Sequence, residues 1–254
     1  MTANRKDRIR ALLKGIETGD EHSVEVVNEE KYIQHNPQTH EGSEGLATLF
    51  KRLSKTSPRV NIVRAFEDRD YVFAHTEYDF DNRNIGFEIF RFEAGQAVEH
   101  WDNIQRRKGP NISGHSMVDG PVESTDFDLT EVNRNLVESF VNTVLIQRRL
   151  DQLGQFVDRQ SYVEHNPDST DGIEAVQQWL AQKSGADFLR TYHTSHKILA
   201  EGDFVLSVCE GFNNAVHTSF FDLYRLDEKR IVEHWDTIEA IPPRSEWKNE
   251  NGKF

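Results

Sequence analysis

The sequence contains a single cysteine, Cys209, among 254 residues. A disulfide framework and a thiolate metal cluster each need several cysteines, so the sequence excludes both. No apolar run reaches the ~20 residues that span a bilayer. The N-terminal segment is polar and leads into no apolar core of a signal peptide. We therefore expect a cytoplasmic protein without a membrane partner.

Basic residues are scarce relative to acidic ones. The chain has 30 Lys and Arg against 43 Asp and Glu, which gives a net charge of −13. Binding to nucleic-acid phosphates requires clustered positive charge. A short basic run at 106–108 follows a predicted strand and is typical of a solvated connector. We predict no nucleic-acid partner.

What the sequence does contain is a repeat. The segment YIQHNP at 32–37 returns as YVEHNP at 162–167, and EHWD at 99–102 returns at 233–236. His35 and His165 are 130 positions apart, and His100 and His234 are 134 apart. Two unusual motifs that recur in the same order at a nearly constant offset predict a tandem duplication.

Hydrophobic periodicity predicts the same order of elements in each half. Helical spacing favours helices at 5–18 and about 136–145, with further ones at 43–54 and 173–184. Four strand patterns follow in each half, at 60–66, 71–80, 85–92 and 97–104, then at 191–199, 204–212, 216–226 and 231–238. Short polar turns between them indicate antiparallel hairpins. We predict an α+β fold with N-terminal helices packed on an antiparallel sheet in each half.

The stretch 108–127 lacks periodicity and carries Gly-Pro pairs at 109–110 and 120–121. Such a composition is typical of a linker. The predicted boundaries are therefore a first domain at 1–107, a linker at 108–127 and a second domain at 128–254. Because the linker includes Ile112, Met117 and Val118, we expect it to lie across the first domain rather than to hang free.

The repeated motifs resemble those of the SnoaL-like polyketide cyclase family, which has the nuclear transport factor 2-like fold. That family shows a Tyr-x-x-His-x-Pro segment, then a glycine, supplied here by Gly42 and Gly172, and a last strand that ends in Glu-His-Trp. The resemblance covers nearly the whole chain, twice, apart from the linker. It implies two cone-shaped domains, each with a strongly curved sheet around a helix and a pocket between them. It also implies an aldol-type cyclase or a related acid/base enzyme that needs neither metal nor organic cofactor.

Alternation along the last strand of the first half places His100 and Asp102 on one face, together with the apolar Ile104. An imidazole and a carboxylate on an apolar face are partly desolvated, and burial moves their pKa values toward the range where protons exchange at neutral pH. A purely structural pair, in which the two side chains satisfy each other, fits the pattern equally well.

The register of the cyclase carboxylate has two alternatives. In the resemblance, this carboxylate lies near the end of the last strand, which fits Asp102. It also fits three residues later, where the two halves carry Gln105 and Glu239. In that second alignment the first domain lacks the carboxylate.

The two halves differ where His75 in the first aligns with Val208 in the second, while Glu88 and Asp222 are equivalent. Relatives often carry a histidine in this strand, so we expect the first domain to hold the active pocket and the second to be degenerate. The alternatives are that His75 is a core histidine and that His35 only stabilises a turn. The predicted catalytic residues are His35, His75, Glu88, His100 and Asp102. The predicted substrate-binding residues are Tyr32, Tyr71, Phe90, His165, Asp222, His234 and Asp236.

A cluster of histidines and carboxylates is also compatible with a metal, but the sequence lacks the tight spacing of known metal motifs, so we predict none. Two functions remain. The first is a small-molecule enzyme without a cofactor that performs acid/base chemistry on a carbonyl compound, either an aldol-type cyclisation or an isomerisation. The alternative is a non-catalytic duplicated module that binds a hydrophobic metabolite or a partner protein. In either case we expect an intramolecular pseudo-dimer, with Trp101 and Trp235 at the domain interface and further homo-oligomerisation open.

Overall fold

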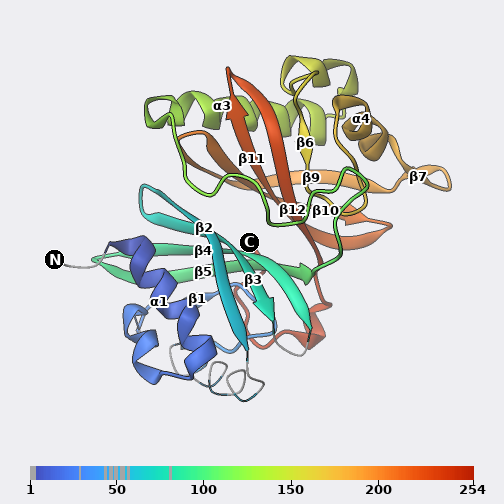
Figure 1. Ribbon diagram of the computed structural model, residues 1–254. Helices are drawn as coiled ribbons and strands as arrows, with labels where there is room; N and C mark the ends of the chain where they lie inside the picture. The colour runs from blue at the N-terminus through green and yellow to red at the C-terminus, as the bar shows by residue number, and fades with distance from the viewer. Residues whose placement is uncertain are drawn as a thin grey trace. The chain divides into compact units, whose positions relative to one another are not determined.

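The computed structural model describes residues 4–28, 30–42, 45, 48, 51, 55, 58–79 and 82–254 (Figure 1). The chain forms two compact units. Unit 1 comprises Met1–Arg106 and Pro242–Phe254, and unit 2 comprises Arg107–Ile241.

Unit 1 consists of helices followed by an antiparallel sheet. Its described elements are α1 (Arg5–Thr18), the 3₁₀ helix η1 (Glu21–Val26), β1 (Ile33–Gln34), β2 (Arg59–Asp68), β3 (Tyr71–Asp79), β4 (Arg83–Glu93) and β5 (Gln96–Arg106). The strand order is β1-β5-β4-β3-β2, and only the short β1 pairs in parallel with its neighbour.

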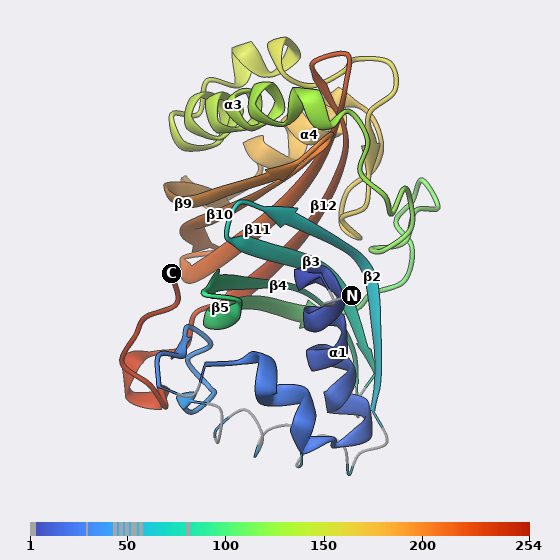
Figure 2. The same ribbon diagram turned by 90° about the vertical axis from the view of Figure 1, so that its left-hand side faces the viewer.

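Helix α1 forms where its amphipathic pattern and both of its caps agree. The Asn4 side chain accepts a hydrogen bond from the Asp7 amide at the start, and Gly19 adopts φ 70° at the end, a conformation that favours glycine. The apolar stripe of α1 is buried against the sheet in the core of unit 1. In Figure 2, α1 lies along one face of that sheet.

Unit 2 has the same plan and the strand order β6-β12-β11-β10-β9. Its helical elements are η3 (Phe127–Leu129), α3 (Thr130–Phe140), the π-helical η4 (Val141–Ile146), η5 (Leu150–Gln155) and α4 (Ile173–Ala181). Its strands are β6 (Val163–Glu164), β7 (Lys183–Ser184), β8 (Asp187–Phe188), β9 (Arg190–Glu201), β10 (Phe204–Asn213), β11 (Val216–Asp227) and β12 (Arg230–Ala240). Residues of α3, η4 and α4 form one core with the sheet.

The predicted α+β class is confirmed in both units. Each of the eight long predicted strands is present and extends by up to three residues beyond its predicted bounds, where these residues are described. Interruptions in the strand pairing, such as those between β9 and β10, bend the ladders and give each sheet its strong curvature. The helix predicted at 43–54 lies largely outside the described residues. The helix predicted at 173–184 ends at Ala181 instead, because the hairpin β7–β8 begins at Lys183.

The structure divides the chain differently from the predicted boundaries. Residues 107–126, which we call the unit 2 arm, belong to unit 2. The Asn111 side chain donates to the Glu164 carbonyl at 2.6 Å, and the Trp235 indole donates to the Asp119 carbonyl at 3.0 Å. These hydrogen bonds hold the arm on β6 and β12.

The last residues of the chain are also placed differently from the prediction. Residues 242–254, the unit 1 arm, belong to unit 1 rather than to the second domain. The Asn249 side chain donates to the carbonyls of Asn36 and Thr39 at 2.8 and 3.0 Å. Asn251 donates to the Gln34 carbonyl at 3.0 Å.

No helix among the described residues combines the length and the apolarity of a membrane span.

We predict that Asn249→Ala destabilises unit 1 by about 1–3 kcal/mol, because one buried and one half-buried carbonyl lose their donor. The urea denaturation midpoint, followed by tryptophan fluorescence, should fall. Glu250→Ala alters the exposed neighbouring residue and should leave the midpoint unchanged. Equal midpoints for the two variants would show that the arm contributes nothing to unit 1.

Candidate functional site

Ionisable side chains lie on the face of each sheet that packs against the helices, which we call the inner face. In unit 2, Asp222 of β11 lies directly opposite Asp236 of β12, and Tyr224 lies opposite His234. Because side chains alternate along a strand, all four project to the same face. All four are buried.

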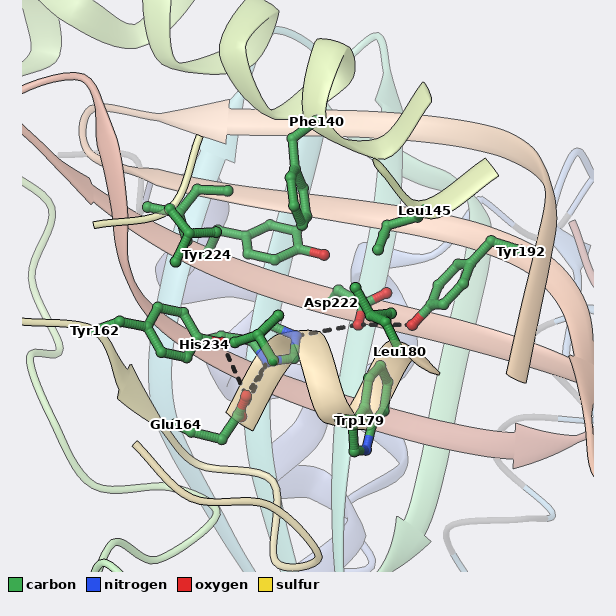
Figure 3. Close-up of a pocket in the computed structure, with 13 residues that line it drawn as sticks. Phe140, Leu145, Tyr162, Glu164, Trp179, Leu180, Tyr192, Asp222, Tyr224 and His234 are labelled. Atoms are coloured by element: carbon green, nitrogen blue, oxygen red, sulfur yellow. Dashed lines mark hydrogen bonds and ion pairs between the residues drawn. The ribbon is translucent and has the colours of Figure 1, made fainter. Parts of the chain in front are cut away.

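His234 lies between two carboxylates (Figure 3). Its Nδ1 is 3.0 Å from Glu164 Oε1, and its Nε2 is 3.1 Å from Asp222 Oδ1. Tyr162 donates its hydroxyl to Glu164 at 2.8 Å, and Tyr192 donates to Asp222 at 3.5 Å. The result is a hydrogen-bonded row of five side chains across the inner face.

Burial and charge act in opposite directions on this row. Burial alone lowers the pKa of His234, but Glu164 and Asp222 outweigh it and raise that pKa well above its ordinary value. Burial raises the pKa of Asp222, and His234 offsets part of the effect. The two carboxylates therefore favour the protonated form of the His234 imidazole.

The carboxyl of Asp236 has fewer hydrogen-bond partners to offset its burial than the other carboxyls of this face. Asn166 donates to its Oδ2 at 2.6 Å, whereas its Oδ1 has no hydrogen-bond partner among the described residues. Burial is the largest influence and raises the pKa of Asp236 to about 7, with further increases from Glu164 and Asp222. Asp236 thus exchanges its proton close to neutral pH.

A narrow pocket with about 20 Å³ of free space, partly open to solvent, lies above this row. In Figure 3 the Tyr224 hydroxyl points into the space between Phe140, Leu145 and Asp222. The lining is mostly aromatic and aliphatic, with a few polar groups at one end, as is usual for small-molecule sites. It is formed by Phe140, Leu145, Val157, Tyr162, Glu164, Val176, Trp179, Leu180, Tyr192, Asp222, Tyr224, Ile231 and His234.

Unit 1 carries a related cluster on its inner face. Glu88 lies opposite Asp102, and Phe90 lies opposite His100, on whose ring it stacks at 4.4 Å. His100 Nε2 is 2.7 Å from Glu88 Oε2, and its Nδ1 is 2.9 Å from Gln34 Oε1. Burial raises the pKa of Glu88, and His100 offsets part of the effect.

The structure therefore brings together three predicted catalytic residues, Glu88, His100 and Asp102. Of the predicted substrate-binding residues, Tyr32 stacks near His100 at 6.5 Å and Phe90 lies on the same face. In unit 2 it brings together Asp222, His234 and Asp236.

His35 and His165 do not join these clusters. His35 stacks on Trp101 at 4.7 Å, with its Nε2 2.9 Å from Glu99 and its Nδ1 3.0 Å from the Gly252 carbonyl. His165 stacks on Trp235 at 4.6 Å, with equivalent contacts to Glu233 and to the Ser116 carbonyl. Glu99 and Trp101 flank His100 in sequence, so alternation places them on the opposite, outer face.

His75 also lies on the outer face. It pairs with Phe87, not with Glu88, and stacks on the Phe87 ring at 4.5 Å. Tyr71 shares this face and lies 6.1 Å from Trp101. His75 and Tyr71 are therefore separated from the cluster by the sheet, because the hairpin register sets their face. The difference between His75 and Val208 says nothing about either pocket.

Sequence reasoning missed several residues of the site, among them Tyr162, Tyr192 and Asn166. Glu164 contacts His234 and Gln34 contacts His100, each from a strand of only two residues. The sequence did indicate Gln34 and Glu164, because they are the position at which the repeated motif differs between Gln and Glu. Each also lies two residues after a tyrosine that faces the cluster, so alternation places it on the same face.

Two groups of described residues have donor atoms within 4.8 Å of one another and could hold a metal ion. They are Glu88, His100 and Asp102, and Asp222, His234 and Asp236. In unit 2 both ring nitrogens of His234 already face carboxylates, so a metal ion would have to replace one of these contacts.

No protein-family model and no curated protein matches the chain. Solved structures resemble parts of it. A proposed polyketide cyclase from Bacillus cereus is 18% identical over 39% of this chain and 72% of its own, with a TM-score of 0.36. A proposed ketosteroid isomerase from Kribbella flavida is 14% identical over 45% and 84%, with a TM-score of 0.39. A nuclear transport factor 2-like protein of unknown function from Cytophaga hutchinsonii is 14% identical over 41% and 95%, with a TM-score of 0.36. These structures include a proposed polyketide cyclase and a nuclear transport factor 2-like protein, the two kinds of protein whose motifs the repeated segments resemble.

We predict that Glu164→Gln lowers the titration midpoint of His234 by about 1–3 pH units, since a nearby opposite charge has that effect on a pKa. The midpoint is measured by NMR of the histidine ring carbons. The raised pKa of His234 stabilises the folded state below the ordinary value of 6.5, and this contribution is lost as the pH rises through the folded-state pKa. Glu164→Gln should weaken that pH dependence.

The control is Glu174→Gln, which alters an exposed glutamate on α4. If both variants titrate alike, Glu164 does not hold the proton on His234.

Proposed function

We propose that unit 2 is an enzyme site that moves protons on a small carbonyl compound, as in an isomerisation or an aldol-type cyclisation. The observation that supports this proposal is the buried carboxyl of Asp222, which lies at the polar end of an apolar pocket and faces Asp236 on the neighbouring strand. An enzyme that acts on a small molecule is also the kind that two of the similar structures have been proposed to be.

The two carboxyls have different environments and therefore different roles. Asp222 lines the pocket, and its Oδ2 has no hydrogen-bond partner among the described residues. It takes the proton from the carbon next to the carbonyl, and the electron pair moves to the carbonyl oxygen. Asp236, protonated near neutrality, gives its proton to that oxygen.

The resulting enol has two outcomes. In an isomerisation, Asp222 returns the proton to a different carbon as the double bond shifts, and the enol hydroxyl returns its proton to Asp236. In a cyclisation, the enol carbon attacks a second carbonyl of the same molecule; the oxygen of that carbonyl takes the proton from Asp222, and the enol hydroxyl returns its proton to Asp236. His234 keeps Asp222 oriented and stabilises the negative charge that develops during the reaction.

The choice of unit 2 departs from the expectation that the first domain is the active one. That expectation depended on His75, which lies on the outer face. Several positions between 43 and 57 lie outside the described part of unit 1, so a pocket there stays a prediction.

The alternative, a non-catalytic binding module, predicts histidines satisfied by backbone groups. His35 and His165 each meet one backbone carbonyl. The described partners of His234 are carboxylates instead, which favours acid/base chemistry.

We predict that the protein catalyses exchange of α-protons with D₂O in a panel of apolar ketones and β-keto esters, followed by NMR. Asp222→Asn should slow exchange by about 10²–10⁴-fold, because the base is removed. Asp151→Asn, the same substitution at an exposed position of unit 2, should exchange at the parent rate.

Three results would contradict the proposal. The first is exchange in Asp222→Asn at the parent rate, and the second is no exchange with any compound of the panel. The third is a loss of exchange in Glu88→Gln without a loss in Asp222→Asn, which would place the chemistry in unit 1.

The pH profile tests the role of Asp236 separately. The exchange rate of the parent should fall above about pH 7, because Asp236 then loses the proton that it donates. Asp236→Asn cannot ionise, so the profile of the remaining activity should lack this alkaline limb. An unchanged alkaline limb in that variant would remove Asp236 from the mechanism.

A further inference from the structure

The two arms make equivalent contacts in the two units. Asn251 of the unit 1 arm donates to the Gln34 carbonyl, and Asn111 of the unit 2 arm donates to the Glu164 carbonyl. Residues 34 and 164 are equivalent in the repeated motif. In each unit, an asparagine of the arm therefore donates to the equivalent backbone carbonyl.

A second pair of contacts fixes the alignment of the arms. The Gly252 carbonyl accepts a hydrogen bond from His35, and the Ser116 carbonyl accepts one from His165. The next residue in each arm is buried, Lys253 in unit 1 and Met117 in unit 2. Met117 therefore has the same place as Lys253 relative to the histidine-bonded carbonyl, although five positions separate Asn111 from Ser116 and only one separates Asn251 from Gly252.

Lys253 supplies a positive charge to the unit 1 cluster. Its ammonium donates to the Asp102 carbonyl at 2.8 Å and lies 3.5 Å from Asp102 Oδ1. The side chain of Lys253 is 3% exposed and that of Asp102 is 6% exposed, so solvent screens the pair weakly.

Unit 2 has no such cation next to the equivalent aspartate in the part of the chain that the structure describes. Asp236 Oδ1 lacks a partner there, and the arm contributes the thioether Met117, whose sulfur accepts a hydrogen bond from the Lys108 amide. The charged groups nearest Asp236 are Glu164 of β6, Asp222 of β11 and His234 of β12, with Arg190 of β9 farther away.

We propose that the residue following each arm's capping carbonyl, Lys253 or Met117, decides which of the two clusters exchanges protons near neutral pH. Lys253 acts as a positioning residue that supplies a cation next to Asp102 and makes the unit 1 cluster inactive in proton exchange. Met117 withholds that charge, so Asp236 keeps a proton in unit 2. The effect of these residues on catalysis rests on the proposed function. Their effect on the protonation of the carboxyls does not, because it can be measured without a substrate.

The test exchanges the two residues in the full chain. In Met117→Lys the carboxyl that titrates near pH 7 should move toward acid by about 1–3 pH units, the usual effect of an adjacent opposite charge. In Lys253→Met a second aspartate carboxyl should keep its proton to higher pH than in the parent. Both are followed by NMR of protein labelled with ¹³C at the aspartate carboxyls.

Matched variants separate charge from packing. Met117→Leu keeps an apolar side chain in the unit 2 arm and should titrate like the parent. Lys248→Met removes an exposed lysine from the unit 1 arm and should do the same. If Met117→Lys fails to fold, Lys253→Met alone decides, because it tests the effect of the arm's charge on the neighbouring carboxyl in the other unit.

Parent-like titration of Lys253→Met, or the same curve for Met117→Lys and Met117→Leu, would overturn the inference. The same samples also report α-proton exchange, which Met117→Lys should slow at pH 7. Shifted titrations without any α-proton exchange would refute the proposed function and support this inference. Exchange with unshifted titrations would support the proposed function and refute this inference.

Discussion

The pairing of an imidazole with carboxylates on the inner face of a sheet is the constraint on which both units depend. A carboxylate that leaves water costs several kcal/mol unless a partner and hydrogen bonds replace the solvent. In unit 2 that partner is His234, which lies between Glu164 and Asp222. Removing one member of such a buried pair typically costs about 3–5 kcal/mol. The sheet curvature, the short strand β6 and the arm all serve to hold these groups in contact.

The residues that repeat between the units mostly have structural roles. His35 and His165 each stack on a tryptophan and connect an arm to the outer face. The residues that differ set the charge of the clusters. Position 34 is a neutral Gln in unit 1, and its equivalent in unit 2 is the acidic Glu164. One scaffold can therefore hold two proton states, because the scaffold residues and the charge-setting residues are different positions.

Much of the fold could be predicted from the sequence because long strands and amphipathic helices carry their own periodicity. Alternation alone placed His100 and Asp102 together. It could not place His75 relative to Glu88, since that relation depends on the register across a hairpin. The strands β1 and β6 have two residues each and show no period. The arms contain no long helix or strand, only the three-residue 3₁₀ helix η6 (Arg244–Glu246), so nothing in their sequence indicated which unit they would join.

The two clusters differ in the balance of carboxyls and cations. Unit 1 places two carboxyls, Glu88 and Asp102, near one imidazole and one ammonium. Unit 2 places three carboxyls near one imidazole. Where acid groups outnumber cations away from water, a carboxyl relieves the repulsion by keeping its proton, as in aspartic dyads. That retained proton is the one a substrate can receive. The excess of acid in unit 2 is thus the physical basis for the acid/base chemistry that we propose there.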